Sequence, residues 1–282
     1  MNSKTSTSRE DAIKANIYVH SSIVSQYENE PHFRPENQIK VKERLLELME
    51  RLPEKSHSRL LDFGCGTGFI INLIKDHFER IDGVDVTQAM LDRIDTSSGN
   101  IFLHQGPAES TPFEDSVFDM ASAYSFMDHL ADYKELLLEA HRVLKPGGIL
   151  YIDLNPNQKY WLALEQLDKQ PDGLHPFVMD EIYAAIHNDE RVSKQYNIDK
   201  NTLVMAEPAK TQAFGFDADE VLSAAREIGY SNVYAHYHWY LAQAKVMHQQ
   251  SFEVADYIDE HLRRLSPLTD HLYKYLEFTF VK

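Results

Sequence analysis

The stretch LLDFGCGTGFI, residues 60–70, decides the fold class predicted for this chain. It starts as an apolar run typical of a buried β-strand, and FIINLIKDHF (69–78) has the pattern of a helix. Between them stand Gly64, Gly66 and Gly68. A strand, a glycine-rich turn and a helix start let a ligand approach the backbone, because glycine has no side chain. The stretch therefore predicts a nucleotide-binding loop in an α/β protein.

The spacing of the glycines separates two kinds of nucleotide site. The dinucleotide pattern G-x-G-x-x-G needs its third glycine at position 69, which is Phe69 here. The chain instead has an acidic residue, Asp62, two positions before the first of three alternating glycines. A carboxylate in this turn repels a pyrophosphate but can hold an ammonium or an amino-acid head group. The spacing therefore argues against a dehydrogenase.

A second acidic residue, Asp85, stands near the end of the predicted strand IDGVDV (81–86). A carboxylate at the end of the neighbouring parallel strand can accept hydrogen bonds from both hydroxyls of a ribose. The alternative is that Asp85 only caps the following helix, a role that Thr87 can also fill. The coincidence of loop and spacing favours ribose binding.

The rest of the chain alternates strand and helix signals over its first half, which indicates βαβ units and a parallel sheet. Strands are predicted at 59–63, 81–86, 100–105, 118–125, 149–154, 232–241 and 275–282. Helices are predicted from about 9 to 27, after the proline-containing stretch 28–37 to about 52, and at 69–78, 87–95, 132–144 and 217–230. Residues 155–213 and 243–272 show helical patterns that interrupt this alternation.

Composition limits the possible partners and locations. The chain has 28 Lys and Arg residues and 44 Asp and Glu residues, so its net charge is −16. The negative electrostatic field of such a protein repels nucleic acid. Cys65 is the single cysteine, so it has no partner for an internal disulfide. The first residues have no apolar segment of signal-peptide type, and no apolar run reaches the roughly 18 residues of a membrane helix. We expect a cytoplasmic protein with no nucleic-acid or membrane partner, as a monomer or homodimer.

Four stretches together resemble the class I S-adenosylmethionine-dependent methyltransferases, in their small-molecule type. They are LLDFGCGTG (60–68), GVDVTQAML (83–91), QGPAESTPFEDSVFD (105–119) and HRVLKPGGILYIDL (141–154). The resemblance implies a Rossmann-like α/β fold, with a seven-stranded sheet that is mostly parallel, a last strand that is antiparallel and helices on both faces. It also implies that S-adenosyl-L-methionine is the cofactor.

The domain organisation follows from this resemblance. Residues 1–55 are expected to form a helical segment that covers the cofactor site. The methyltransferase core is expected at 56–154, 214–242 and 273–282. The helical cap insertions, 155–213 and 243–272, then lie on the substrate side.

The resemblance also assigns cofactor-binding residues. Those around the methionine part are Asp62, Gly64, Cys65, Gly66 and Gly68, with Tyr27 and Tyr124 as further contacts. Asp85 is expected to bind the ribose, Val86 to pack on the adenine, and Ala108 to offer its N–H to the ring. The family's usual Asp acceptor for the adenine amino group is Pro107 here, so Glu109 or Gln105 is expected to replace it.

The catalytic candidates are two histidines, because a hydroxyl acceptor benefits from a general base near neutral pH. His129 follows the fourth predicted strand in SAYSFMDHL, where it equally suits a cap of the next helix. His32 belongs to NEPHFRPEN (29–37), which can also be a loop pinned by its prolines, with Phe33 in the core.

Substrate contacts are expected from three further residues. Arg34 can clamp a carboxylate or phosphate, and Tyr18 and Trp161 can contact the acceptor. His236 and His238 have a spacing compatible with a metal, but two ligands do not make a site, and we expect no metal.

The sequence therefore predicts methyl transfer to an oxygen or nitrogen atom of a small organic molecule. Two alternatives stay open. One is a methyltransferase that acts on protein or RNA, and the other is a non-catalytic S-adenosylmethionine-binding regulatory protein.

Overall fold

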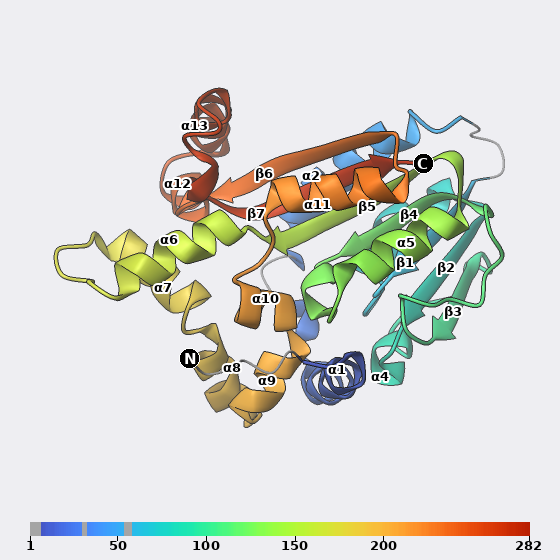
Figure 1. Cartoon of the computed structure of the whole chain (residues 1–282), viewed down its shortest axis with the longest axis horizontal. Helices are drawn as coiled ribbons and strands as arrows, with labels where there is room; N and C mark the ends of the chain where they lie inside the picture. Colours follow the sequence, from blue (N-terminus) through green and yellow to red (C-terminus); the bar gives the residue numbers. More distant parts are fainter. Residues whose placement is uncertain (1–6, 30–32, 54–57) are drawn as a thin grey trace.

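A computed structural model describes residues 7–29, 33–53 and 58–282. Within these ranges the centre is a seven-stranded sheet in the order β3-β2-β1-β4-β5-β7-β6 (Figure 1). The neighbours from β3 to β5 are parallel, and β7 is antiparallel to both β5 and β6. The predicted sheet, mostly parallel with an antiparallel last strand, is confirmed.

The strands carry most of the predicted positions. They are β1 (Arg59–Phe63), β2 (Arg80–Asp85), β3 (Ile101–Gln105), β4 (Phe118–Tyr124), β5 (Leu144–Pro156), β6 (Asn232–Tyr240) and β7 (Tyr273–Val281). β5 is longer than predicted, because Leu144 already pairs with Phe118 and the Gly147 N–H donates to the Lys282 carbonyl. The stretch KPGG is therefore part of the sheet.

Helices cover both faces and one edge of the sheet. The longer ones are α1 (Arg9–Ile23), α2 (Pro35–Met49), α5 (Tyr133–Val143), α6 (Gln158–Asp168), α7 (Pro176–Ala185), α8 (Asn188–Tyr196), α11 (Ala218–Ile228) and α13 (Phe252–Arg264). The shorter ones are α3 (Phe69–Ile74), α4 (Gln88–Leu91), α9 (Lys200–Ala206), α10 (Pro208–Ala213) and α12 (Gln243–Gln249). In the described ranges, single 3₁₀ turns are η1 (Tyr27–Asn29), η3 (Lys75–His77), η4 (Met127–His129) and η5 (Asp270–Leu272).

Several helix boundaries differ from the sequence prediction: α1 ends at Ile23 and α3 at Ile74, and two further differences have a clear local cause. α2 begins at Pro35, inside the expected break, because the first turn of a helix does not need the N–H that proline lacks. The helix predicted at 87–95 is only α4, since the Arg93 and Ile94 N–H groups bond three residues back, to Met90 and Leu91, and tighten the chain into a turn.

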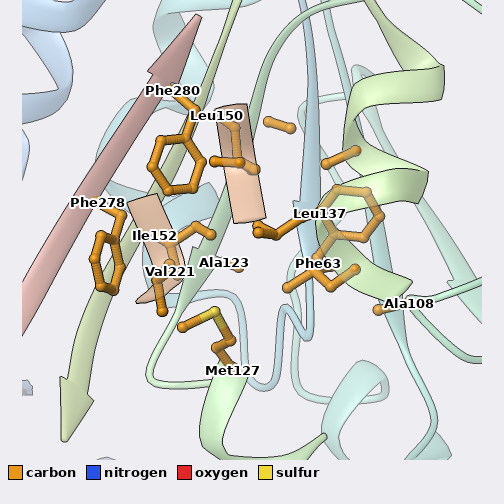
Figure 2. Close-up of a cluster of buried hydrophobic side chains, with 14 of the residues drawn as sticks. Phe63, Ala108, Ala123, Met127, Leu137, Leu150, Ile152, Val221, Phe278 and Phe280 are labelled. Carbon is orange, nitrogen blue, oxygen red and sulfur yellow. The ribbon is translucent and has the colours of Figure 1, made fainter. Parts of the chain in front are cut away.

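The core lies on both faces of the sheet, because successive strand residues point to opposite sides. Figure 2 shows Phe63, Ala123, Leu150 and Ile152 from the strands packed with Leu137 of α5 and Val221 of α11. The other face carries Leu60, Ile81, Met120 and Ile149, which pack on α2 and α3. No helix among the described residues is long and apolar enough to cross a membrane.

The strand order brings several predicted site residues to one edge. Parallel strands end at the same side of a sheet, and in such folds ligands bind outside the carboxyl ends. Asp62, Asp85, Tyr124 and Leu154 stand at or near those ends of β1, β2, β4 and β5. Helices α1, α9 and α10 lie beyond this edge, where α1 contacts α9 (Figure 1).

Candidate active site

The turn after β1 needs its glycines for backbone reasons. Gly64, Gly66 and Gly68 have φ angles of +61°, +52° and +86°, in the left-handed region that other residues rarely adopt. A Cβ atom on Gly64 would lie 2.0 Å from Cδ2 of Phe126, which follows β4. The loop therefore has this shape only with a glycine at position 64.

Asp85 holds the same loop from the neighbouring strand. Its Oδ2 accepts a hydrogen bond from the Gly66 N–H at 3.0 Å, and its Oδ1 accepts one from the Thr87 N–H at 2.8 Å. Burial raises the pKa of this carboxyl, while these N–H groups act in the opposite direction. Asp85 thus does fix the turn before α4, as the alternative held, and it also lines a cavity.

Asp62 is more deeply buried, with 2% of its surface exposed. Its Oδ1 accepts a hydrogen bond from the Ser122 hydroxyl of β4 at 2.6 Å. Burial raises its pKa to about 7, against the hydrogen bond from Ser122 and together with the negative charge of Asp85. A cationic group placed beside Asp62 would favour its charged form.

The first cavity lies between the glycine loop, the ends of β2 and β3, and α1. About 660 Å³ there is not filled by atoms, open solvent at its mouth included. Its walls include the predicted cofactor residues Gly64, Gly66, Asp85, Val86, Ala108 and Glu109. The Glu109 carboxylate, offered as a substitute adenine acceptor, lies 3.3 Å from the Nε of Arg9 in α1. Gln105, the other substitute, donates to the Val86 carbonyl at 3.2 Å.

A third, smaller space continues the first cavity on the β1 side. It encloses about 300 Å³ and is lined by Asp62, Cys65, Thr67, Tyr27 and Tyr124, among others. The Thr67 hydroxyl is buried there without a hydrogen-bond partner among the described residues. Among the described residues, Gly68 does not line the first or the third cavity. It is the N-cap residue of α3.

The second cavity is much larger, with about 2060 Å³ of empty space. It is bounded by α1, by the cap helices α6 to α10 and α12, and by the ends of β5 and β6. Trp161 and Arg34 line it, as predicted for substrate contacts. Tyr18 is 55% exposed and absent from the described walls of all three cavities, so the structure gives its predicted substrate role no support.

Backbone strain also gathers at the second cavity. Ser125, Leu154 and Trp239, which follow or end β4, β5 and β6, have φ angles of +50°, +58° and +60°. All three line this cavity. Non-glycine residues held in the left-handed region are typical of functional sites.

His129 stands where the first and second cavities meet, together with His20, Tyr27 and Ser125. Its Nδ1 donates to the Ala206 carbonyl at 2.9 Å, so Nε2 carries the lone pair. The buried amide of Asn16 donates to the carbonyls of His129 and Ala206 at 3.3 and 3.1 Å. This network joins α1, η4 and α9.

His20 belongs to the N-terminal segment expected to cover the site but was given no role of its own from the sequence, and it borders both cavities. Its ring centroid lies 5.1 Å from that of His129 and 5.8 Å from that of Tyr27. Burial lowers its pKa to about 4, and the nearby His129 adds to this effect. The signal that could have found it is its position one helical turn after Asn16, on the same face of α1.

A cluster of charged side chains lies next to His129. Asp128, His129 and Glu207 each offer a ligand atom, and these atoms lie within 4.8 Å of one another. The Lys210 ammonium lies 2.5 Å from Oε2 of Glu207. Burial raises the pKa of Asp128. Burial acts in the same direction on Glu207, but the charge of Lys210 outweighs it and keeps the pKa of Glu207 below its usual value.

The remaining histidines named from the sequence do not join this cluster. His238 lies 2.7 Å from Oδ1 of Asp153, and the charge of that carboxylate raises its pKa although burial acts to lower it. His236 belongs to no group with metal-ligand spacing in the described ranges. His32, the second catalytic candidate, lies outside the described residues.

Comparison with known proteins gives a consistent picture of the core. Residues 61–152 match a family model described as a methyltransferase domain. A demethylmenaquinone methyltransferase of Staphylococcus saprophyticus is 38% identical over 109 residues, which cover 36% of this chain and 47% of the relative. A malonyl-[acyl-carrier protein] O-methyltransferase of Enterobacter lignolyticus is 25% identical over 162 residues, 51% of this chain and 64% of the relative. The chain thus spans about half the length of such relatives.

Solved structures share the fold at low sequence identity. Haemonchus contortus phosphoethanolamine N-methyltransferase 2, in complex with phosphomonomethylethanolamine and S-adenosylhomocysteine, has a TM-score of 0.51 at 17% identity, covering 86% of this chain and 52% of that one. An S-adenosylmethionine-dependent methyltransferase from Archaeoglobus fulgidus has a TM-score of 0.50 at 18% identity, covering 87% and 94%. At such identities these likenesses describe the fold alone.

Proposed function

We propose that this chain, as a member of the class I S-adenosylmethionine-dependent methyltransferases, transfers a methyl group to a small organic molecule. The group that accepts the methyl is an oxygen or nitrogen atom. The observation that carries the proposal is the junction of two cavities. The first cavity and the much larger second cavity share four residues in their walls, which are His20, Tyr27, Ser125 and His129. A donor in the first can therefore face an acceptor in the second.

The residues around the glycine loop fit S-adenosylmethionine. Asp85 can accept from the ribose hydroxyls, and Val86 and Ala108 line the place expected for the adenine. Asp62 and the unpartnered Thr67 hydroxyl suit the amino-acid end. The bound donor supplies a sulfonium methyl group that is intrinsically reactive, so the protein mainly binds, orients and excludes water.

His129 is the residue that we place at the reacting group. Because Nδ1 is committed to the Ala206 carbonyl, Nε2 can accept a proton from a hydroxyl acceptor. An amine acceptor that is already free of its proton needs no base. Asn16 acts as a positioning residue, since its side-chain amide donates to the backbone carbonyls of His129 and Ala206.

The second cavity supports an organic acceptor with an apolar part. Trp161, Trp239 and Met247 line it beside buried charged groups, as in sites for small molecules. The names of two relatives point to demethylmenaquinone and to malonyl-acyl carrier protein as what those proteins methylate. Arg34, with no ion-pair partner among the described residues, can hold a carboxylate or phosphate of the acceptor.

Location and assembly stay proposals of the same kind. A cytoplasmic protein without nucleic-acid or membrane partners, monomeric or homodimeric, fits the net charge of −16. A protein or RNA acceptor and a regulatory protein without catalysis are the competing possibilities.

A labelled-donor screen tests the function. The purified chain is incubated with donor labelled in the methyl group and with fractions of small metabolites, of protein and of RNA. We expect label in a small-molecule fraction. Label only in protein or RNA would replace the proposed acceptor class. Donor binding without transfer to any fraction would favour the regulatory protein.

A further inference from the structure

We propose that Asp128, His129 and Glu207 form a binding site for a divalent metal ion in the wall of the second cavity. Each residue offers one ligand atom, and the three atoms lie within 4.8 Å of one another. Asp128 and His129 both belong to η4, and Glu207 directly follows α9, so the fold brings distant segments together. The sequence analysis expected no metal.

The first support is an unsatisfied carboxylate oxygen. Asp128 is 93% buried, with 7% of its surface exposed, and its Oδ1 has no hydrogen-bond partner among the described residues. A buried charged oxygen without a partner is costly, and such groups are normally paired or bound to a metal. Asp128 lines the second cavity, so a ligand can reach it.

The second support is the charge balance. The Lys210 ammonium lies 2.5 Å from Glu207 and also interacts with the charge of Asp128, so one buried ammonium serves two carboxylates. Asp189, Arg191 and His20 line the same cavity, yet none of them donates a hydrogen bond to Oδ1 of Asp128. A cation at Asp128 would supply the missing positive charge.

The donor set suits metals that accept both oxygen and nitrogen. Two carboxylates and one imidazole bind Mn²⁺, Fe²⁺, Co²⁺ or Zn²⁺ at distances of about 2.0–2.2 Å. Neighbouring ligand atoms around such an ion lie about 3–3.6 Å apart, so ligand atoms at the 4.8 Å limit of the cluster would move inward by about 1 Å on binding. Three protein ligands leave coordination positions that open into the cavity.

The role of the ion in methyl transfer rests on the proposed function, whereas the binding of the ion to these three residues does not. An ion here lies beside His129, at the junction of the two cavities. It would hold an oxygen atom of the acceptor and lower the pKa of a hydroxyl group bound to it. This chemistry favours acceptors with oxygen ligands, such as vicinal hydroxyl or hydroxy-carbonyl groups. His129 then serves as a ligand, and a protein base is not required.

Manganese titration of the full chain, followed by electron paramagnetic resonance, tests the site. We expect wild-type protein to bind one Mn²⁺, and Asp128→Asn and Glu207→Gln to weaken binding at least about tenfold, since each removes one charged ligand. Lys210→Met should tighten binding, because it removes the competing ammonium. Asp189→Asn is the matched control, since Asp189 lines the same cavity but lies outside the ligand group.

Thermal melts identify any variant that fails to fold, and such a variant is left out of the comparison. Wild-type protein that binds no Mn²⁺, or whose binding is equal in Asp128→Asn, Glu207→Gln and Asp189→Asn, overturns the site. Calorimetry with S-adenosylmethionine is run on the same samples. Protein that binds Mn²⁺ but not the donor keeps the metal site and refutes the proposed function. The reverse result refutes the metal site alone.

Discussion

The first and second cavities differ in how they are built. The first is made mainly by short-range features of the sheet, a glycine turn after β1 and the Asp85 carboxylate at the end of β2 that accepts from the Gly66 N–H, and α1 closes one side of it. The second is made by helices from distant parts of the chain, α1, α6 to α10 and α12. Most of the first is therefore readable in local sequence. Under the proposed function, the first cavity holds the donor and the second holds the acceptor.

The largest effect is expected from Asp85→Ala, which attacks the first cavity. It removes a charged acceptor for two ribose hydroxyls, and hydrogen bonds to charged groups contribute about 1.5–3 kcal/mol each. We expect the Kd for S-adenosylmethionine, measured by calorimetry, to rise about 100-fold or more. Asp189→Asn, in the second cavity, is the control and should leave it unchanged. An unaltered Kd in Asp85→Ala would rule out the ribose contact.

Gly64→Ala is the next test, because it changes only the shape of the loop. The left-handed φ of +61° and the 2.0 Å approach to Phe126 predict a loss of about 2 kcal/mol in the free energy of unfolding. Chemical denaturation measures it. The double variant with Phe126→Ala should recover part of the loss if the clash matters. A Gly64→Ala protein as stable as wild type would contradict the observed loop.

Arg34→Met sharpens the comparison from the side of the second cavity. We expect the KM for the acceptor found in the labelled screen to rise about tenfold, a loss of roughly 1.4 kcal/mol of binding. The Kd for the donor should stay the same, because Arg34 does not line the first cavity. Tyr18→Phe is a matched control on the exposed surface of α1. Equal effects of the two substitutions would remove Arg34 from the acceptor site.

The last effect depends on pH and concerns His20, at the junction of the cavities. Its pKa is about 4 in the folded chain and about 6.5 when unfolded, so between these values only the unfolded chain binds the proton. Stability is therefore lost as pH falls from 6.5 towards 4, by at most about 1.4 kcal/mol per pH unit. His20→Gln should remove this part of the pH dependence, so the variant should lose less stability than wild type as the pH falls. Thermal melts at pH 5 and pH 7.5 measure it, and an unchanged slope would mean that His20 is accessible to water.

Much of the fold was predictable because its signals are local. The strand LLDF, the alternating glycines and Asp85 each act within a few residues, and the predicted sheet follows from them. The contact of Glu109 with Arg9 was not predictable, since α1 reaches it across 100 residues of sequence. The same holds for His20, Asp128 and Glu207, which come together only when α1, η4 and α9 pack.

Local rules also explain the errors. Pro35 was placed in a break because proline disfavours helix in the residue before it, yet at the first turn it begins α2. Asp85 was given two competing roles, and the structure has it bound to the Thr87 N–H while it lines the cavity. Tyr18 was named because the segment before β1 was expected to cover the site; it lies on an exposed part of α1, and its substrate contact stays a prediction.

The central claim is that the first cavity holds a sulfonium nucleoside and not a dinucleotide. Isothermal titration calorimetry of the full chain with S-adenosylmethionine and, separately, with NAD⁺ tests it most directly. The account predicts one bound S-adenosylmethionine per chain and no heat from NAD⁺. Binding of NAD⁺ without binding of S-adenosylmethionine would contradict it.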